Sequence, residues 1–172
     1  RILPVGEIAA LCRRRGLLCI VDASQSAGSL PIDMRALGID LLCMAGHKGL
    51  MGAGGTGLLL LSPDVQVAPI LFGGTGTNSN SVQQPEDYPE RQESGTINTH
   101  GIISMDAGIG VLRAAPRYQE ERRLAQQLYQ GLRGIEKVEL YCAFDPGRYV
   151  GIVPFNIRGR GSTGVANLLA AE

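Results

Sequence analysis

Two short segments of the chain carry an acid and an amine just after apolar runs. Asp22 follows the apolar run Leu17–Val21. Lys48 comes shortly after a second apolar run, Leu41–Met44. Charged groups at the ends of neighbouring buried strands are costly to keep there without partners. A carboxylate pairs with a protonated ring nitrogen and an amine attaches to an aldehyde, so one ligand with both groups would satisfy the two residues together.

Pyridoxal 5'-phosphate (PLP) is a cofactor with this combination of groups. Its aldehyde forms a Schiff base with a lysine, and an acid beside its ring nitrogen keeps that nitrogen protonated. We therefore expect Lys48 to be the catalytic residue and Asp22 to pair with the ring. Gln25, a little further on, reaches the ring's phenolic oxygen if the turn curls back. His47 is a candidate to donate to the cofactor phosphate or to stack nearby.

Each of these residues also has a purely structural interpretation. Asp22 and Ser24 can simply form a turn, and Lys48 can be a surface lysine in a glycine-flanked turn. Thr96 lies just before Asn98, where a helix is expected to begin. Backbone N–H groups and a hydroxyl at such a place form either an anion site or an ordinary helix cap. Taken singly, the residues leave both interpretations open.

The glycine-rich segment 52–57 matches the pattern G-x-G-x-x-G but does not fit a dinucleotide site. That fingerprint follows a strand and opens a helix, whereas these glycines precede the apolar stretch 58–61. A flexible turn beside the lysine is the better interpretation.

The elements that must position these residues alternate between helix and strand. Apolar periodicity and capping residues predict helices at 4–15, 99–112 and 117–132, and a last one from Ser162 or Thr163. Apolar runs predict strands at 17–21, covered on both faces, and at 40–44, 56–61, 138–142 and 150–157. Such an order is typical of an α/β layered fold. The segment 72–95, without periodicity, is a long loop of a kind that usually has a function.

Composition excludes several classes of function. With 172 residues, 44% of them hydrophobic and 19% charged, the chain is expected to be globular with a sizeable core. Its 16 basic and 16 acidic residues balance, so no nucleic-acid partner is expected. The apolar stretches are too short for a membrane span. The cysteines show neither zinc-binding nor disulfide spacing, which predicts no metal site and a cytoplasmic protein: Cys12, Cys19, Cys43 and Cys142.

The motifs together are much more specific than each motif alone. D-x-x-Q, H-K, a glycine-rich turn and strand, G-G-T-G-T and R-x-E-x-G-T-x-N follow one another in that order. This series resembles the class V aminotransferase family of PLP enzymes, and within it the cysteine desulfurases and selenocysteine lyases. The resemblance implies that Asp22 pairs with the pyridine nitrogen and Gln25 with the ring oxygen. It places His47 at the phosphate, Lys48 in the Schiff base, and Thr96 at the phosphate of the other subunit, hence a homodimer with shared active sites.

The same resemblance, which covers about residues 4–169, implies a fold. It predicts an α/β fragment of a PLP-dependent transferase of fold type I. Residues 1–112 would form the C-terminal half of the PLP-binding large domain, with part of a mainly parallel sheet. Residues 113–172 would be the truncated start of a smaller α+β C-terminal domain.

Three features depart from the family pattern. Ala45 stands where a serine often helps to hold the phosphate. The family's N-terminal portion, with its main phosphate-binding turn and a ring stacked on the cofactor, has no counterpart in the chain. The chain also ends about where the family continues to an arginine for the substrate carboxylate and to the reactive cysteine. No cysteine of the chain is therefore assigned as the nucleophile.

The activity implied by the resemblance is that of a cysteine desulfurase, which takes a small amino acid as its substrate. Such an enzyme removes sulfur from L-cysteine, gives alanine and an enzyme persulfide, and passes the sulfur to an acceptor protein. A class V aminotransferase or a selenocysteine lyase is the alternative within the family. A structural or dimerising piece without cofactor is the alternative outside it. We expect the 172 residues alone to bind PLP weakly and to be inactive.

Overall fold

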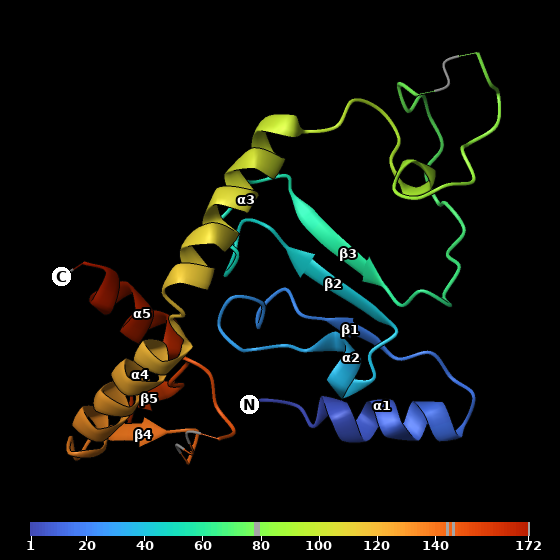
Figure 1. The fold of residues 1–172 in the computed structure, drawn as a ribbon. Coiled ribbons are helices and arrows are strands. Elements are labelled where there is room, and N and C mark those ends of the chain that lie inside the picture. The colour runs from blue at the N-terminus through green and yellow to red at the C-terminus, as the bar shows by residue number, and fades with distance from the viewer. Residues whose placement is uncertain (78–79, 144, 146, 172) are drawn as a thin grey trace.

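The computed structural model describes residues 1–77, 80–143, 145 and 147–171, and its first part is built on a three-stranded sheet (Figure 1). β1 (Ile20–Asp22) pairs in parallel with β2 (Leu41–Ala45). β2 pairs with β3 (Gly57–Leu61) in the antiparallel sense. The expected mainly parallel sheet is thus mixed in the described residues. The reason is that the connection from β2 to β3, residues 46–56, contains no crossover helix, so β3 returns antiparallel to β2.

α1 (Val5–Arg14) leads into the first strand and agrees with the predicted helix to within one residue at each end. Pro4 stands directly before the helix, where the missing N–H would have been unpaired in any case. Gly16 ends the helix with a φ of +64°, a backbone conformation that suits glycine. Ala9 is the buried residue of α1.

β1 is shorter than its apolar run predicts, and the side chains of that run are more exposed. The N–H of Leu17 still donates to the carbonyl of Cys12 at 2.9 Å, and the carbonyl of Cys19 is the first to accept from β2. Leu17, Leu18 and Ile20 are 60%, 59% and 65% exposed. The prediction of a strand at 17–21 covered on both faces is therefore wrong for the part of the chain that the structure describes. Within that part, β1 is an edge strand, so one of its sides has no pairing partner.

α3 (Thr99–Ala114) packs onto the turns that follow the strands. The Asn98 side chain accepts from the N–H of Gly101 at 3.1 Å, which confirms the predicted cap and contributes about 1 kcal/mol. Met105, 4% exposed, reaches from α3 into the core cluster. The other members of that cluster come largely from the segments after β1 and β2: Ala23, Ala27, Ile39, Leu42 and Leu50. The core thus fixes the two segments that carry Asp22 and Lys48.

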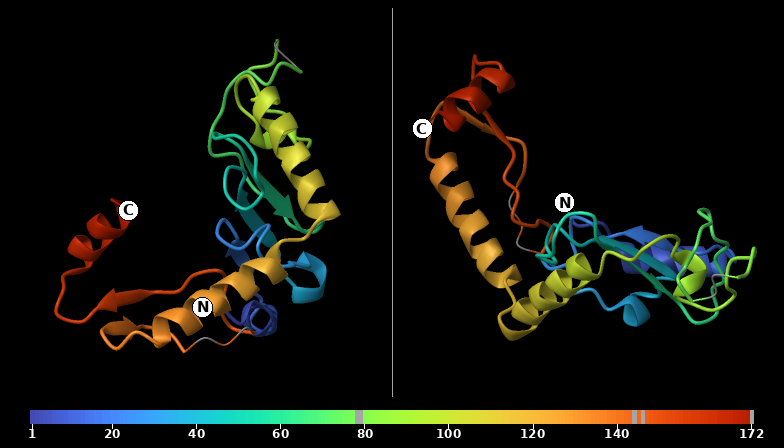
Figure 2. Two further views of the ribbon diagram at one scale, coloured as in Figure 1. Left: turned by 90° about the vertical axis from the view of Figure 1, so that its left-hand side faces the viewer. Right: turned by 90° about the horizontal axis from the view of Figure 1, so that it is seen from above.

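The C-terminal part contains a second, two-stranded antiparallel sheet. α4 (Tyr118–Arg133) precedes β4 (Val138–Leu140), and β5 (Phe155–Ile157) precedes α5 (Ser162–Ala170). Figure 2 shows this group to one side of the first sheet and reached through α3 and α4. The predicted strands at 138–142 and 150–157 are longer than those observed, because pairing stops at Leu140 and Phe155. The division of the chain after residue 112 stays a prediction.

Two short helices complete the described chain. α2 (Met34–Leu37) is capped by Asp33, whose carboxylate accepts from the N–H of Ala36 at 2.9 Å. The 3₁₀-helix η1 (Glu90–Gln92) lies inside the long loop at 72–95. Across the described residues, no helix has the length and apolar character that crossing a membrane would require.

Candidate functional site

Asp22 is the last residue of β1 and its side chain is exposed. Directly after it, the N–H of Ala23 donates to the carbonyl of Cys43 at 2.8 Å, and Ala23 itself is fully buried. The carboxylate Oδ1 accepts from the N–H of Ser24 at 2.8 Å. The turn expected from the purely structural interpretation is therefore present. A carboxylate accepts about four hydrogen bonds, so the contacts with Ser24 leave Asp22 free to bind a further donor.

Hydrogen bonds keep Asp22 ionised. The hydroxyl of Ser24, followed by its backbone N–H, holds the pKa of Asp22 below its ordinary value of 3.8. The slight burial of the carboxyl acts in the opposite direction, and the positive charge of Lys48 adds to the lowering of this pKa. The ammonium group of Lys48 thus lies near enough to stabilise the charged form of the Asp22 carboxylate. Sequence spacing cannot establish this proximity, because the two residues follow different strands.

Lys48 lies in a closed loop between two anchored residues. The N–H of Gly46 donates to the carbonyl of Thr56 at 2.9 Å, and the N–H of Gly52 donates back to the carbonyl of Gly46 at 2.8 Å. Leu50 is 7% exposed and belongs to the core cluster, whereas His47 and Lys48 are exposed. The loop therefore presents these two side chains to solvent while its ends are fixed.

Four of the predicted site residues follow the neighbouring strands β1 and β2, whereas Thr96 comes from another part of the chain. Asp22 ends β1 and Gln25 lies shortly after it, whereas His47 and Lys48 follow β2; all four are exposed. No hydrogen bond or ion pair within the described ranges links Thr96 to them. The preceding Gly95 donates from its N–H to the carbonyl of Gly74 at 2.8 Å, which holds the segment to the long loop.

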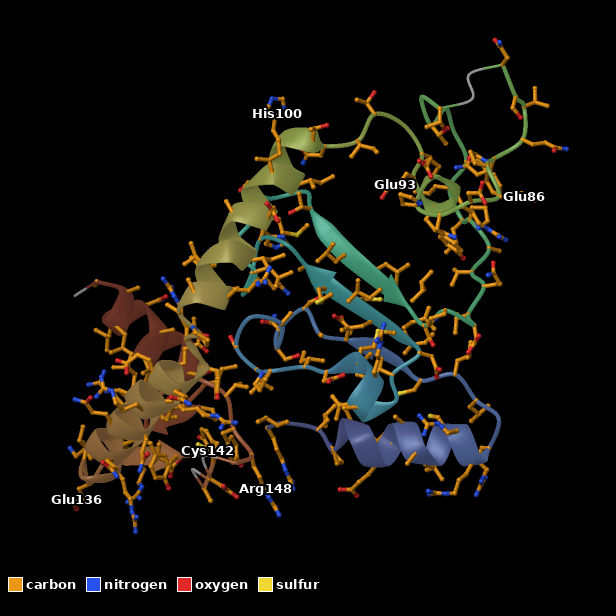
Figure 3. The ribbon with its side chains drawn as sticks, in the orientation of Figure 1. Glu86, Glu93, His100, Glu136, Cys142 and Arg148 are labelled. Carbon is orange, nitrogen blue, oxygen red and sulfur yellow. The ribbon has the colours of Figure 1, made fainter. Side chains whose placement is uncertain are left out.

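The first turn of α3 packs against the glycine-rich turn, since a β-carbon on Gly55 would lie 3.6 Å from the side-chain nitrogen of Asn98. His100, in the first turn of α3, is exposed and points outward from the sheet (Figure 3). A role of Thr96 toward a cofactor held by Lys48 of the same chain has no support in these contacts. A role across two subunits stays a prediction.

A cleft of about 520 Å³ adjoins one side of the site. Asp22 and Gln25 line it together with mainly apolar residues such as Val21 and Ile39, and Arg122 of α4 lies on its wall. His47 and Lys48 are not among its lining residues. The four residues therefore form an open surface at the strand ends, and they do not surround one closed pocket in the described chain.

Several positioning contacts were not predicted from the sequence. Ser24 holds Asp22, although the sequence suggested only a turn there. Ser104 of α3 accepts from the N–H of Ala53 at 3.1 Å and ties the glycine-rich turn to the helix. A β-carbon on Gly46 would lie 2.9 Å from the sulfur of Met105, so the lysine loop also packs closely against α3. Only the clustering of glycines around Lys48 gives a sequence signal for this close packing.

Comparison with known proteins identifies the family. The Aminotransferase class-V family model matches residues 1–172. The chain belongs to this family. A probable cysteine desulfurase of Methanothermobacter thermautotrophicus is 35% identical over 98% of this chain and 43% of the relative. A second probable cysteine desulfurase, from Pyrococcus abyssi, is 32% identical over 91% of this chain and 40% of the relative.

Solved structures give the same fold. The apo structure of a cysteine desulfurase from Thermococcus onnurineus matches with a TM-score of 0.79 at 29% identity, over 98% of this chain and 44% of that chain. The cysteine desulfurase CsdA of Escherichia coli matches with a TM-score of 0.86 at 24% identity, which shows the shared fold. The predicted α/β fold of a PLP-dependent enzyme family is confirmed. The chain spans less than half the length of these relatives.

Enzymes of the class V aminotransferase family use PLP, and the residues of this chain fit that group. Asp22 offers an ionised carboxylate suited to a protonated ring nitrogen. Lys48 offers an exposed amine within the electrostatic reach of Asp22. The open surface at the strand ends leaves both groups accessible to one ligand, as expected at the carboxyl ends of strands in α/β sheets.

Proposed function

We propose that the full-length protein is a PLP-dependent cysteine desulfurase, which removes sulfur from L-cysteine to give alanine and an enzyme persulfide. The observation that carries the proposal is that an ionised Asp22 and a Lys48 whose charge lowers the pKa of Asp22 lie at the ends of neighbouring strands. Support for the substrate comes from relatives that are named as probable cysteine desulfurases, at 35% and 32% identity.

Each side chain of the site has its own proposed role. PLP, when bound, supplies a protonated ring that withdraws electrons from the substrate carbon. Asp22 would keep a negative charge beside the ring nitrogen, and Gln25 would donate to the ring oxygen. Lys48 would hold the cofactor through its amine, and the same amine would take and return protons at the substrate carbon. His47 donates to the phosphate, where Ala45 offers no hydroxyl.

The sulfur transfer needs a thiolate that we place outside these residues. That thiolate attacks the sulfur of the substrate cysteine, and the carbon–sulfur bond breaks. The electron pair of this bond stays with the substrate carbon, which takes a proton and becomes the methyl group of alanine. The sulfur remains on the enzyme as a persulfide, from which an acceptor protein or an added thiol removes it.

Turnover by the full-length protein tests this function. With PLP, L-cysteine and dithiothreitol, we expect alanine and sulfide to form in equal amounts without any 2-oxo acid. Chromatography of amino acids and a colorimetric sulfide assay measure the two products. Alanine formation that requires a 2-oxo acid and releases no sulfide would instead indicate an aminotransferase.

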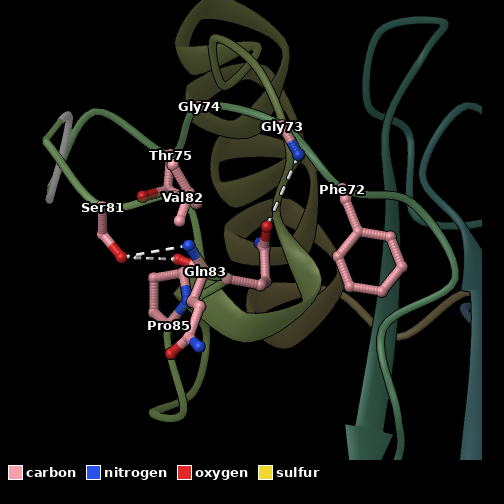
Figure 4. A pocket seen from close by; sticks show the side chains of 9 residues that line it. Phe72, Gly73, Gly74, Thr75, Ser81, Val82, Gln83 and Pro85 are labelled. Atoms are coloured by element: carbon pink, nitrogen blue, oxygen red, sulfur yellow. Dashed lines mark hydrogen bonds between the residues drawn. The ribbon is translucent and has the colours of Figure 1, made fainter.

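We also propose that the protein is a homodimer, because the long loop and the residues just before it expose apolar side chains. Ile70, Phe72 and Val82 are 88%, 71% and 104% exposed, and a second copy of the chain would cover them. Hydrogen bonds nonetheless link residues within the described parts of the loop. Ser81 Oγ, for example, pairs with both the carbonyl and the N–H of Gln83 at 3.1 Å (Figure 4). An ordered apolar loop suits an interface better than a mobile one does.

Mixed dimers test whether the active sites are shared. Dimers of Lys48→Ala subunits should lack covalently bound PLP, and dimers of Thr96→Ala subunits should bind PLP about tenfold more weakly, because a hydrogen bond to a charged phosphate is lost. A dimer with one subunit of each kind has one site that retains both Lys48 and Thr96. We therefore expect the purified mixed dimer to regain high-affinity PLP binding in one of its two sites, measured by absorbance titration. No gain on mixing would place Thr96 and Lys48 of each site in one subunit.

A further inference from the structure

The segments that follow β1 and β2 touch through their backbones. A β-carbon placed on Gly28 would overlap the carbonyl oxygen of Gly49 and lie 2.5 Å from its carbonyl carbon. One placed on Gly49 would overlap the carbonyl oxygen of Ala27 and lie 3.2 Å from that carbonyl carbon. Neither position therefore accepts a side chain unless one of the two segments moves.

Gly28 is restricted by its conformation as well as by space. Its φ of +85° lies in the left-handed region, where an L-residue with a β-carbon is strained. The atoms that it faces belong to the backbone, so they cannot rotate aside as a flexible side chain would. A larger residue at Gly28 would thus act directly on the spacing between the two segments.

In each segment, only a short and constrained stretch of chain separates the glycine contact from the functional side chain. Between Asp22 and Gly28, the N–H of Ala27 donates to the carbonyl of Ala23 at 2.8 Å, and these two alanines are 5% and 0% exposed. On the other side, Gly49 is bonded directly to Lys48. A displacement at the contact would therefore reach Asp22 through a buried turn, and Lys48 through one peptide bond.

From this geometry we infer that Gly28 and Gly49 are positioning residues, whose backbone contact sets the spacing between the carboxylate of Asp22 and the amine of Lys48. The inference rests on the proposed PLP site and extends it to residues that touch no cofactor. Two groups that must meet opposite ends of one rigid ring tolerate little error in their spacing. A misplacement of about 1 Å at such a site can cost about 10²-fold.

The test uses the full-length protein freed of PLP, with Gly28→Ala and Gly49→Ala made separately. Three quantities are measured: the dissociation constant for PLP, the visible circular dichroism of bound PLP, and the unfolding temperature of the PLP-free protein. We expect the affinity for PLP to fall by about 10-fold to 10²-fold. We also expect the dichroism of the remaining bound cofactor to change in amplitude, because its orientation between Asp22 and Lys48 changes.

Two other glycines serve as matched controls. Gly38, at the end of α2, has a φ of +72° and its β-carbon would overlap the guanidinium of Arg13. Gly38→Ala should therefore lower the unfolding temperature and leave the affinity for PLP unchanged. Gly54 lies in the turn after the lysine loop, and a β-carbon placed on it would have no neighbouring atom within 4 Å, so Gly54→Ala should change neither quantity.

Three results would overturn the inference. One is an unchanged affinity and dichroism in both Gly28→Ala and Gly49→Ala. Another is an equal loss of affinity in Gly38→Ala at a matched unfolding temperature. The third is complete loss of the folded PLP-free state in both variants, which would make the contact a requirement of the fold as a whole. Failure of the proposed desulfurase activity would appear separately, as unaltered protein that binds PLP but forms no alanine from cysteine.

Discussion

Replacing Lys48 by alanine in the full-length protein abolishes the covalent attachment of PLP and lowers alanine formation from cysteine by on the order of 10³-fold. The amine is expected both to hold the cofactor and to move protons at the substrate carbon, so its removal affects two steps. The measurements are the visible absorbance that stays with the protein after gel filtration and the initial rate of alanine formation. This is the largest effect that we expect from any single substitution in the chain.

Lys137 provides the matched control, because Lys48 and Lys137 are the lysines of the chain. Lys137 is exposed and precedes β4, and its carbonyl accepts from the N–H of Arg158 at 2.7 Å. A change of its side chain leaves this backbone bond in place. Lys137→Ala should therefore keep both the attached cofactor and the activity. Retention of covalently bound PLP in Lys48→Ala would refute the assignment.

The second large effect is expected from Asp22→Asn, with a loss of activity of about 10²-fold. A neutral amide does not favour the protonated ring nitrogen, so the ring withdraws electrons less strongly. The variant should still attach PLP through Lys48, and this separates its effect from that of Lys48→Ala. Asp64→Asn, in an exposed turn after β3, is the control that removes a carboxylate elsewhere. Equal losses in both variants, or none in Asp22→Asn, would contradict the role of Asp22.

The lowered pKa of Asp22 also predicts how the spectrum of bound PLP depends on pH. Because the hydrogen bonds from Ser24 lower that pKa below the ordinary value of 3.8, the carboxylate stays charged at neutral and mildly acidic pH. Its contribution to stability is fully present above the ordinary value and is lost as the pH falls through the lowered pKa. The visible spectrum of bound PLP in the unaltered protein should therefore show no transition from Asp22 at mildly acidic pH. Ser24→Ala should move any such transition upward.

The elements that the sequence predicts well are those with strong local signals. The cap at Asn98 and the apolar stripe that follows it define α3 to within two residues. The turn at Asp22 and the loop at Lys48 are equally local, since they depend on polar residues and glycines that end apolar runs. Such features follow from capping and periodicity, which act over a few residues.

The features that the sequence does not predict depend on contacts between distant segments. An apolar run shows that Leu17–Val21 prefers burial, but it does not show whether the described chain contains the elements that would cover it. The contact between Gly28 and Gly49 joins two loops whose distance in space is set by the pairing of β1 with β2. The proposed role of Thr96 requires a second copy of the chain, for which a single sequence carries no direct pattern.

The most direct test of the account is to map the lysine that carries PLP. The full-length protein is loaded with PLP, the bond between amine and aldehyde is fixed with borohydride, and the digested protein is analysed by mass spectrometry. We expect the cofactor on the peptide that contains Lys48 and on no other lysine. Attachment to Lys137, to a lysine outside these residues, or to none would contradict it.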